Sequence, residues 1–77
     1  MANIDKLITK MKNQPNGITF AEADKVLTAY GYHFIRRKSS HCSFRNENGD
    51  VITIVDRNDS IKKVYVVEIL NRIGEAN

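Results

Sequence analysis

The spacing of apolar residues follows a helical period at both ends of the chain and a strict alternation in between. Near the N-terminus, apolar residues three and four positions apart predict a short amphipathic helix over residues 4–12, which ends before the turn sequence Pro15-Asn16-Gly17. A second helix is expected to begin at Thr19, whose side chain can form a capping box with Glu22, and to end at Gly31. The first part of the chain is therefore predicted to be a pair of helices joined by a turn.

The middle of the chain alternates between apolar and polar residues. This pattern predicts a meander of three strands, over residues 32–37, 41–46 and 51–55. Asn48-Gly49 supplies the positive backbone dihedrals that tight hairpin turns need, so the second and third strands are expected to pair. A last helix is predicted from about Ser60 to the stop signal at Gly74.

This order of elements predicts an α+β fold in which helices cover one face of a three-stranded antiparallel sheet. In the second strand, Cys42 and Phe44 are apolar and should face the core, which directs His41, Ser43 and Arg45 to the other, solvent-exposed face. The predicted core packs two helices against the sheet through Leu27, Tyr30, Val64 and Leu70 on one side and Phe34, Phe44, Ile52 and Ile54 on the other.

Length and composition limit the classes of protein to consider. At 77 residues the chain is expected to be one small domain, residues 1–77, with a thin core. No apolar run approaches the roughly 20 residues of a membrane span or follows a signal-peptide pattern, so no membrane association is expected. The lone Cys42 cannot form an internal disulfide, and we expect a reduced, cytoplasmic setting.

The net charge of +3 is modest, but positive charge is concentrated around one histidine. The run Arg36-Arg37-Lys38-Ser39-Ser40-His41 places three cations just before the imidazole, Arg45 follows, and no acidic residue lies between Arg36 and Arg45. An imidazole with a pKa near 6.5 can take the proton of a 2′-hydroxyl, while cations hold the charge on a phosphate and Ser40 can donate a hydrogen bond to it. This combination suits an RNA phosphate.

Other interpretations of the same residues remain open. An exposed strand histidine is more often a solvated surface residue than a catalyst, and cations on an edge strand also discourage aggregation. Arg36 and Arg37 must point to opposite faces, so they cannot both line one pocket. His33, His41 and Cys42 lack the spacing of a recognised metal site. A second proton carrier cannot be assigned, although Tyr65 or Lys63 could lie close in space.

The ordered pattern of motifs resembles that of a known family, the HicA (YcfA-like) toxins of bacterial toxin-antitoxin modules. The resemblance covers roughly residues 18–73. The stretches that carry it are Val26-Leu27 with Gly31-Tyr32, Ile35-Arg36-Arg37, Ser39-Ser40-His41, Phe44 through Ile54, and Tyr65-Val66-Val67-Glu68-Ile69-Leu70.

The resemblance implies a fold similar to a double-stranded-RNA-binding domain, an α-β-β-β-α sandwich, here with an extra short N-terminal helix. It also implies a ribonuclease that cuts messenger RNA without a metal or other cofactor. His41 would be the catalytic residue, and a HicB-like antitoxin would cover it in a hetero-oligomer. The residues expected to bind RNA are Arg36, Arg37, Lys38, Ser40 and Arg45.

Two positions depart from the family pattern. Ser39 stands where the signature has glycine, and a serine adopts positive backbone dihedrals less easily. Val55-Asp56 stands where many relatives have a proline. These departures leave a second hypothesis open, a non-catalytic module of the same fold that binds RNA or a protein partner. A third is a structural protein whose basic face docks on an acidic partner.

Overall fold

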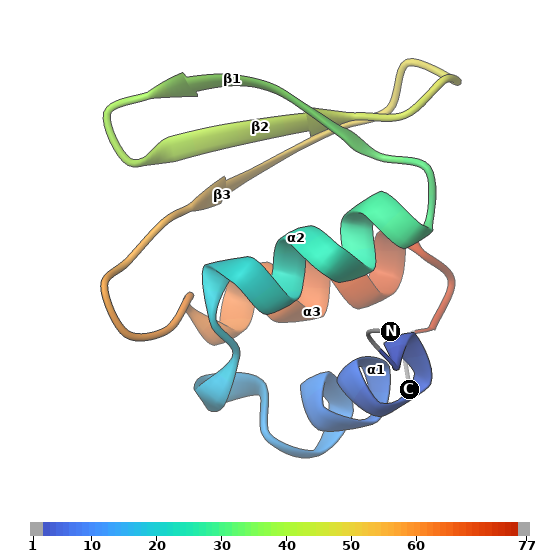
Figure 1. Ribbon diagram of the computed structural model, residues 1–77, viewed down its shortest axis with the longest axis vertical. Coiled ribbons are helices and arrows are strands. Elements are labelled where there is room, and N and C mark those ends of the chain that lie inside the picture. Colours follow the sequence, from blue (N-terminus) through green and yellow to red (C-terminus); the bar gives the residue numbers. More distant parts are fainter. Residues whose placement is uncertain (1–2, 76–77) are drawn as a thin grey trace.

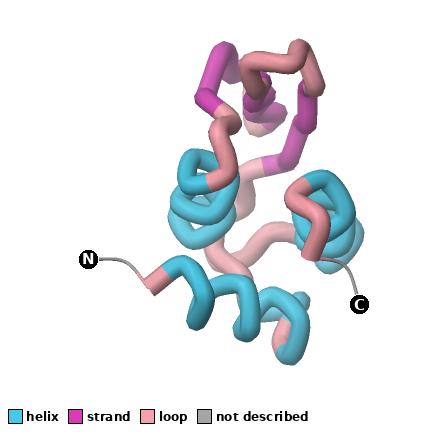
Figure 2. Tube along the Cα trace, turned by 90° about the vertical axis from the view of Figure 1, so that its right-hand side faces the viewer, coloured by secondary structure: helices cyan, strands magenta, loops and turns pink. Residues whose placement is uncertain are grey.

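The protein is built in three layers, a sheet, a pair of helices and a single helix (Figure 1). The computed structural model describes residues 3–75. Its elements are α1 (Ile4–Asn13), the 3-10 helix η1 (Pro15–Gly17), α2 (Phe20–Ala29), β1 (His33–Lys38), β2 (His41–Arg45), β3 (Val51–Val55) and α3 (Lys63–Arg72). Figure 2 shows α2 and α3 side by side beneath the sheet, with α1 below both. The predicted α+β fold, α-β-β-β-α with an additional N-terminal helix, is confirmed.

The helix boundaries at the N-terminal end follow from local capping. The Glu22 amide donates to the Thr19 hydroxyl at 3.2 Å, and the Thr19 amide donates to the Glu22 carboxylate at 3.0 Å, which is the predicted capping box. Lys10 of α1 donates to the same carboxylate at 2.8 Å. Gly31 has a φ of 88°, as a left-handed residue after a helix requires. The hydrogen bond from Lys10 ties α1 to the start of α2.

The sheet is antiparallel with β2 in the centre and β1 and β3 at the edges. Along the β1–β2 pair, Phe34 lies opposite Phe44 whereas Arg36 lies opposite Ser43, so Ile35 is an extra residue, a β-bulge. Residues opposite each other in a ladder point to the same face. The bulge therefore decides which cations of β1 share a face with the polar residues of β2.

The β2–β3 hairpin differs from the predicted tight turn. Only Gly49 has a positive φ, of 86°, and Asn48 does not. The Gly49 amide donates to the Asn46 carbonyl at 3.0 Å, and the Asn46 side chain accepts from the amides of Asn48 and Asp50. An asparagine that bonds its own turn favours this wider loop with a single left-handed glycine.

One hydrophobic cluster joins the three layers. It consists of Ile8, Met11, Ile18, Ala23, Val26, Leu27, Tyr32, Cys42, Phe44, Ile52, Ile54, Ile61, Val66, Ile69 and Leu70. Leu27, Leu70, Phe44, Ile52 and Ile54 were predicted correctly. The N-terminal helix contributes Ile8 and Met11, so it covers the far side of the helix pair.

Three predicted core residues are exposed instead: Tyr30 (39%), Phe34 (53%) and Val64 (64%). Helix α3 begins at Lys63 rather than near Ser60, and its buried stripe is Val66, Ile69 and Leu70, which turns Val64 outward. Tyr30 caps the end of α2, outside the buried stripe of that helix. Phe34 packs edge-on against Phe44 at 5.7 Å between ring centroids, but an edge strand leaves its other side open.

Candidate functional site

His41 lies on the open face of the sheet, away from the helices. Its neighbours Cys42 and Phe44 are fully buried against the helices, and alternation along β2 sends His41, Ser43 and Arg45 the other way. His41 and Arg45 are exposed and Ser43 is half-buried. The orientation predicted for these residues is confirmed, and a ligand can reach the His41 imidazole.

The open face brings two cations of β1 beside the polar residues of β2. Lys38 lies directly opposite His41, and Arg36 lies opposite Ser43. Side chains in such positions start about 5 Å apart at Cβ, within reach of a shared phosphate. On the other side, the Ser43 hydroxyl is 3.0 Å from that of Thr53 on β3.

Arg45 lies at the other end of β2, opposite His33 and Val51. Arg45 is four positions from His41 along the strand, a distance of about 13 Å at 3.3 Å per position. Arg45 therefore lies on the same face as His41, but too far along it for the two side chains to contact the same phosphate. The cations form a track along the sheet rather than one pocket.

Arg37 points to the opposite face from Arg36 and Lys38, as its pairing with the buried Cys42 shows. Its Nη1 donates to the Asp56 carboxylate at 2.8 Å, and its Nε donates to the carbonyl of Ser39 at 2.9 Å. The hydrogen bond to Asp56 raises the pKa of the Arg37 guanidinium above its usual value. The expected division between Arg36 and Arg37 is thus present.

The turn between β1 and β2 is strained at Ser39. Its φ of 58° is the only positive value among the non-glycine residues that the structure describes. The left-handed conformation costs an L-residue roughly 1–2 kcal/mol, so the surrounding contacts must hold it. Ser40, half-buried, follows in the same turn, and its carbonyl accepts from the Asp56 amide at 2.8 Å.

The candidate second proton carriers are not on this face. Lys63 and Tyr65 belong to α3, in the helical layer behind the sheet, and Tyr65 packs partly buried against the core.

Within residues 3–75, no three His, Cys, Asp or Glu side chains gather in a group that could hold a metal ion. Over the same residues, no helix is long and apolar enough to cross a membrane.

Sequence reasoning missed two residues of this region, Asp56 and Thr53. In the sequence, Asp56 stands out only as a departure from a family pattern, and its bond to Arg37 spans 19 positions. The contact between Thr53 and Ser43 could not be predicted, because the register between β2 and β3 is not evident from the sequence. Alternation from Ile52 and Ile54 would have placed Thr53 on the open face, which was the one available signal.

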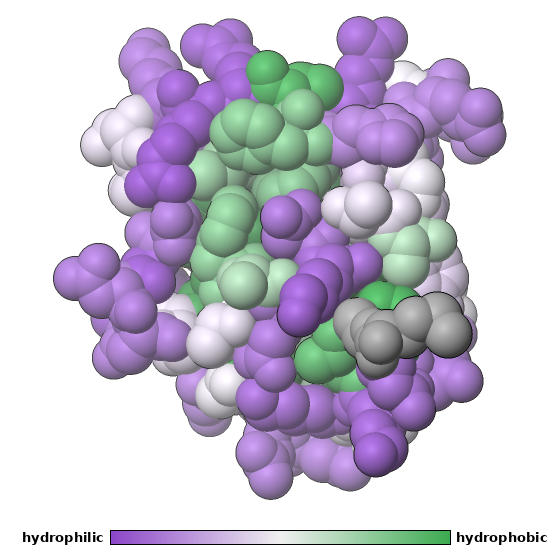
Figure 3. Space-filling model, viewed as in Figure 1, coloured by the Kyte–Doolittle hydropathy of each residue, from purple (hydrophilic) through white to green (hydrophobic). Residues whose placement is uncertain are grey.

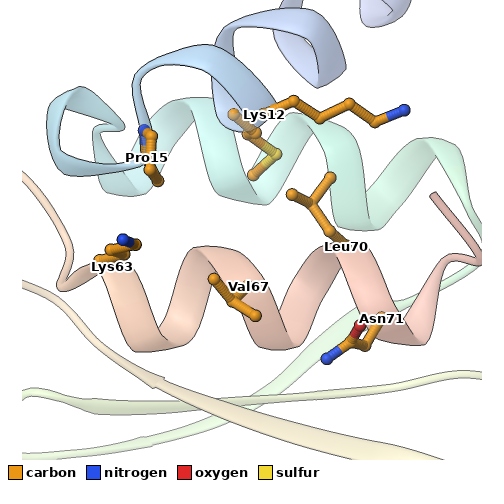
Figure 4. Close-up of a pocket in the computed structure, with 7 residues that line it drawn as sticks. Lys12, Pro15, Lys63, Val67, Leu70 and Asn71 are labelled. Atoms are coloured by element: carbon orange, nitrogen blue, oxygen red, sulfur yellow. The ribbon is translucent and has the colours of Figure 1, made fainter. Parts of the chain in front are cut away.

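Two apolar surface features lie apart from His41. A pocket of about 290 Å³ opens between the α1–η1 segment and α3, lined by Met11, Lys12, Pro15, Lys63, Val67, Leu70 and Asn71 (Figure 4). Phe34 and Ile35 on β1 are about half exposed, and Figure 3 shows apolar surface between the strands and α2. Neither feature includes a residue of the open face around His41.

Comparison with known protein families gives a match. The model of the HicA toxin family, toxins of bacterial toxin-antitoxin systems, matches residues 20–75. No curated protein and no solved structure matches the chain. The matched region begins at the first residue of α2 and includes the sheet and α3, whereas α1 precedes it. The match extends over more than half of the chain, and the protein belongs to the HicA toxin family.

Proposed function

We propose that this toxin is a metal-independent endoribonuclease that cuts messenger RNA, with His41 as its catalytic residue and a HicB-like antitoxin as its inhibitor. Family membership supports a toxin with a partner antitoxin. The observation that best supports the chemistry is the cross-strand pair on the open face, where Lys38 lies directly opposite the exposed His41.

The proposed reaction is attack of a 2′-hydroxyl on the adjacent phosphorus. Neutral His41 takes the proton of the 2′-hydroxyl, and the 2′ oxygen forms a bond to phosphorus as the bond to the 5′ oxygen breaks. The products are a 2′,3′-cyclic phosphate and a 5′-hydroxyl end. Lys38 stabilises the charge on the phosphate oxygens, and water at this open site supplies the proton of the leaving oxygen.

The remaining residues hold the RNA. Arg36 and Arg45 lie along the same face and suit successive phosphates of one strand, and the Ser40 hydroxyl can donate to a phosphate oxygen. Arg37 adds to the local positive charge, although its guanidinium is bonded to Asp56. In this proposal the cations bind phosphates and no particular base. The affinity for RNA is therefore predicted to depend strongly on salt concentration.

A second candidate is a module of the same fold that binds RNA or a protein partner without cutting. The observation that favours it is Ser39, which occupies a left-handed position with a φ of 58° in the turn that leads into His41. Strain at this position can misplace His41 while leaving the cationic track intact.

The two candidates are separated by inducing the wild type, His41→Ala and His33→Ala in a bacterial host. His33 is the matched control, because it is also an exposed strand histidine and lies at the other end of the sheet. Growth arrest and loss of messenger RNA with the wild type and His33→Ala, but not with His41→Ala, support the ribonuclease. Equal, harmless growth of all three, at verified soluble expression, supports the binding module.

A further inference from the structure

We propose that Arg37 is a positioning residue: anchored on Asp56, it holds the turn that precedes His41 and so fixes where the His41 side chain stands on the open face. The proposal rests on the proposed function, because it gives Arg37 a task in the same site. Its basis is the set of hydrogen bonds around Ser39 and Ser40.

Both peptide groups that lead into His41 are held by a hydrogen bond. Nε of Arg37 donates to the Ser39 carbonyl at 2.9 Å, and the amide of Asp56 donates to the Ser40 carbonyl at 2.8 Å. A peptide group is planar and moves as a unit, so holding its oxygen fixes its orientation. The direction in which the chain enters His41 is therefore set by Arg37 and Asp56 together.

The Arg37 guanidinium is itself fixed in place. Its Nη1 donates to the Asp56 carboxylate at 2.8 Å and lies 3.5 Å from Sγ of the buried Cys42. A planar guanidinium directs Nε and Nη1 to two different acceptors at once, which a lysine ammonium on a flexible stem does not reproduce. Asp56 takes part twice, through its carboxylate and through its backbone amide.

The turn needs such support because of Ser39. A non-glycine residue stays in the left-handed region only where its surroundings over-determine it. The Ser39 side chain is exposed, and the bond from Arg37 acts on the carbonyl of this same residue. Loss of that bond would let the turn relax and move the start of β2, where His41 stands.

The two possible roles of Arg37, positioning the turn and binding a phosphate, predict different results for the variant Asp56→Ala. If Arg37 held a phosphate, removing its acidic partner would free the cation and strengthen RNA binding. If Arg37 holds the turn, Asp56→Ala loosens the turn and slows the chemical step without weakening binding. Arg37→Lys separates the two roles in the same way, because it keeps the charge and loses the directed bond to Ser39.

The test is steady-state cleavage of an RNA oligonucleotide by the wild type, Asp56→Ala and Arg37→Lys. Glu68→Ala is the matched control, because it removes a surface carboxylate from an ion pair with Arg72 on α3, where the Glu68 oxygen and Arg72 Nη2 are 2.9 Å apart. We expect kcat to fall at least about tenfold in both test variants with KM within about twofold, since small misplacements of a catalytic group are costly.

Addition of Ser39→Gly to Asp56→Ala should recover part of the lost kcat, because glycine occupies the left-handed region without strain. The control Glu68→Ala should cleave like the wild type. An unchanged kcat in Arg37→Lys, or a lower KM with unchanged kcat in Asp56→Ala, would overturn the proposal. Asp56→Leu, which has a similar size and no hydrogen-bond acceptor, takes the place of Asp56→Ala if the alanine variant does not fold.

A measurement without RNA decides the same question independently. A left-handed residue gives a strong nuclear Overhauser effect between its own amide and Hα protons. We expect this signal at Ser39 to weaken in folded Asp56→Ala and Arg37→Lys and to persist in Glu68→Ala. Its persistence in both test variants overturns the positioning role, whether or not the protein cuts RNA. A wild type that cuts no RNA refutes the proposed function alone.

Discussion

At the level of single residues, the placement of His41 combines exposure with a nearby positive charge. Cys42 and Phe44, which follow it on the same strand, are fully buried, so the well-packed strand directs the imidazole outward. Lys38 lies opposite it. A histidine on a well-packed strand with a cation across the ladder suits the proposed cleavage, which needs a base for the 2′-hydroxyl and a counter-charge for the phosphate.

Ser39→Gly should stabilise the protein. The φ of 58° imposes strain on serine that glycine does not feel, and the greater freedom of glycine in the unfolded chain offsets part of the gain. We expect the free energy of unfolding to rise by up to about 1 kcal/mol, measured by urea denaturation. Ser40→Gly, at the next position with an ordinary φ, should lower it. A loss of stability in Ser39→Gly would contradict the account of the turn.

Individual orientations on β2 could be predicted from the sequence, because the apolar residues Cys42 and Phe44 mark the inner face and the period of a strand does the rest. The contacts of β1 could not be. The bulge at Ile35 has no marker in the sequence, and it changes the facing of the later β1 residues. The bond between Arg37 and Asp56 depends on the fold of the 19 positions that separate them.

At the level of elements, α1 is part of the fold although it lies outside the matched family region. Met11 is 1% exposed and packs in the shared core. Met11→Ala should lower the free energy of unfolding by roughly 2–5 kcal/mol, since the cavity adds to the lost burial. Thr9→Ala, an exposed position on the same helix, should change it by less than about 0.5 kcal/mol. Equal, small effects would show that α1 is not an integral element.

The contact between α1 and α2 should make stability depend on acid pH. The hydrogen bond from Lys10, together with that from the Thr19 amide, lowers the pKa of Glu22 below its ordinary value of 4.5. The folded pKa lies below the unfolded one, so this contribution is fully present above about pH 4.5 and is lost as pH falls through the folded pKa. Glu22→Gln should lose less than about 1 kcal/mol at pH 7.

The free energy of unfolding of Glu22→Gln should also fall less steeply than that of the wild type as the pH decreases through the acid range. Urea denaturation between pH 7 and pH 3 measures both effects. Glu47→Gln, at an exposed position in the β2–β3 turn, serves as the control and should follow the wild type. A Glu22→Gln curve parallel to that of the wild type through the acid range would mean that the contact with Lys10 is not formed in solution.

The existence and order of the elements could be predicted because each has a strong local signal, such as the Thr19 capping box and the Gly31 stop. The buried face of α3 was less accessible. Apolar residues nearly surround that helix, and only packing selects Val66, Ile69 and Leu70 over Val64 and Val67. An amphipathic pattern this broad does not define one face.

At the level of the whole molecule, the cations of the open face should make RNA binding sensitive to salt. Each phosphate neutralised on a single strand contributes about 0.7 to the slope of log affinity against log salt concentration. Lys38→Gln and Arg45→Gln should each weaken binding and reduce the slope by about that amount. Lys25→Gln, on α2 in the helical layer, should leave the slope unchanged. An equal reduction by all three would indicate a diffuse charge effect.

The central claim is that His41 cuts RNA, and the most direct measurement is cleavage of a purified RNA by the purified toxin in the presence of a chelator. The wild type and His33→Ala should produce fragments with 2′,3′-cyclic phosphate ends, while His41→Ala should be slower by at least about 100-fold, the low end of what a positioned acid or base contributes. Cleavage by His41→Ala at the rate of the wild type would contradict the account.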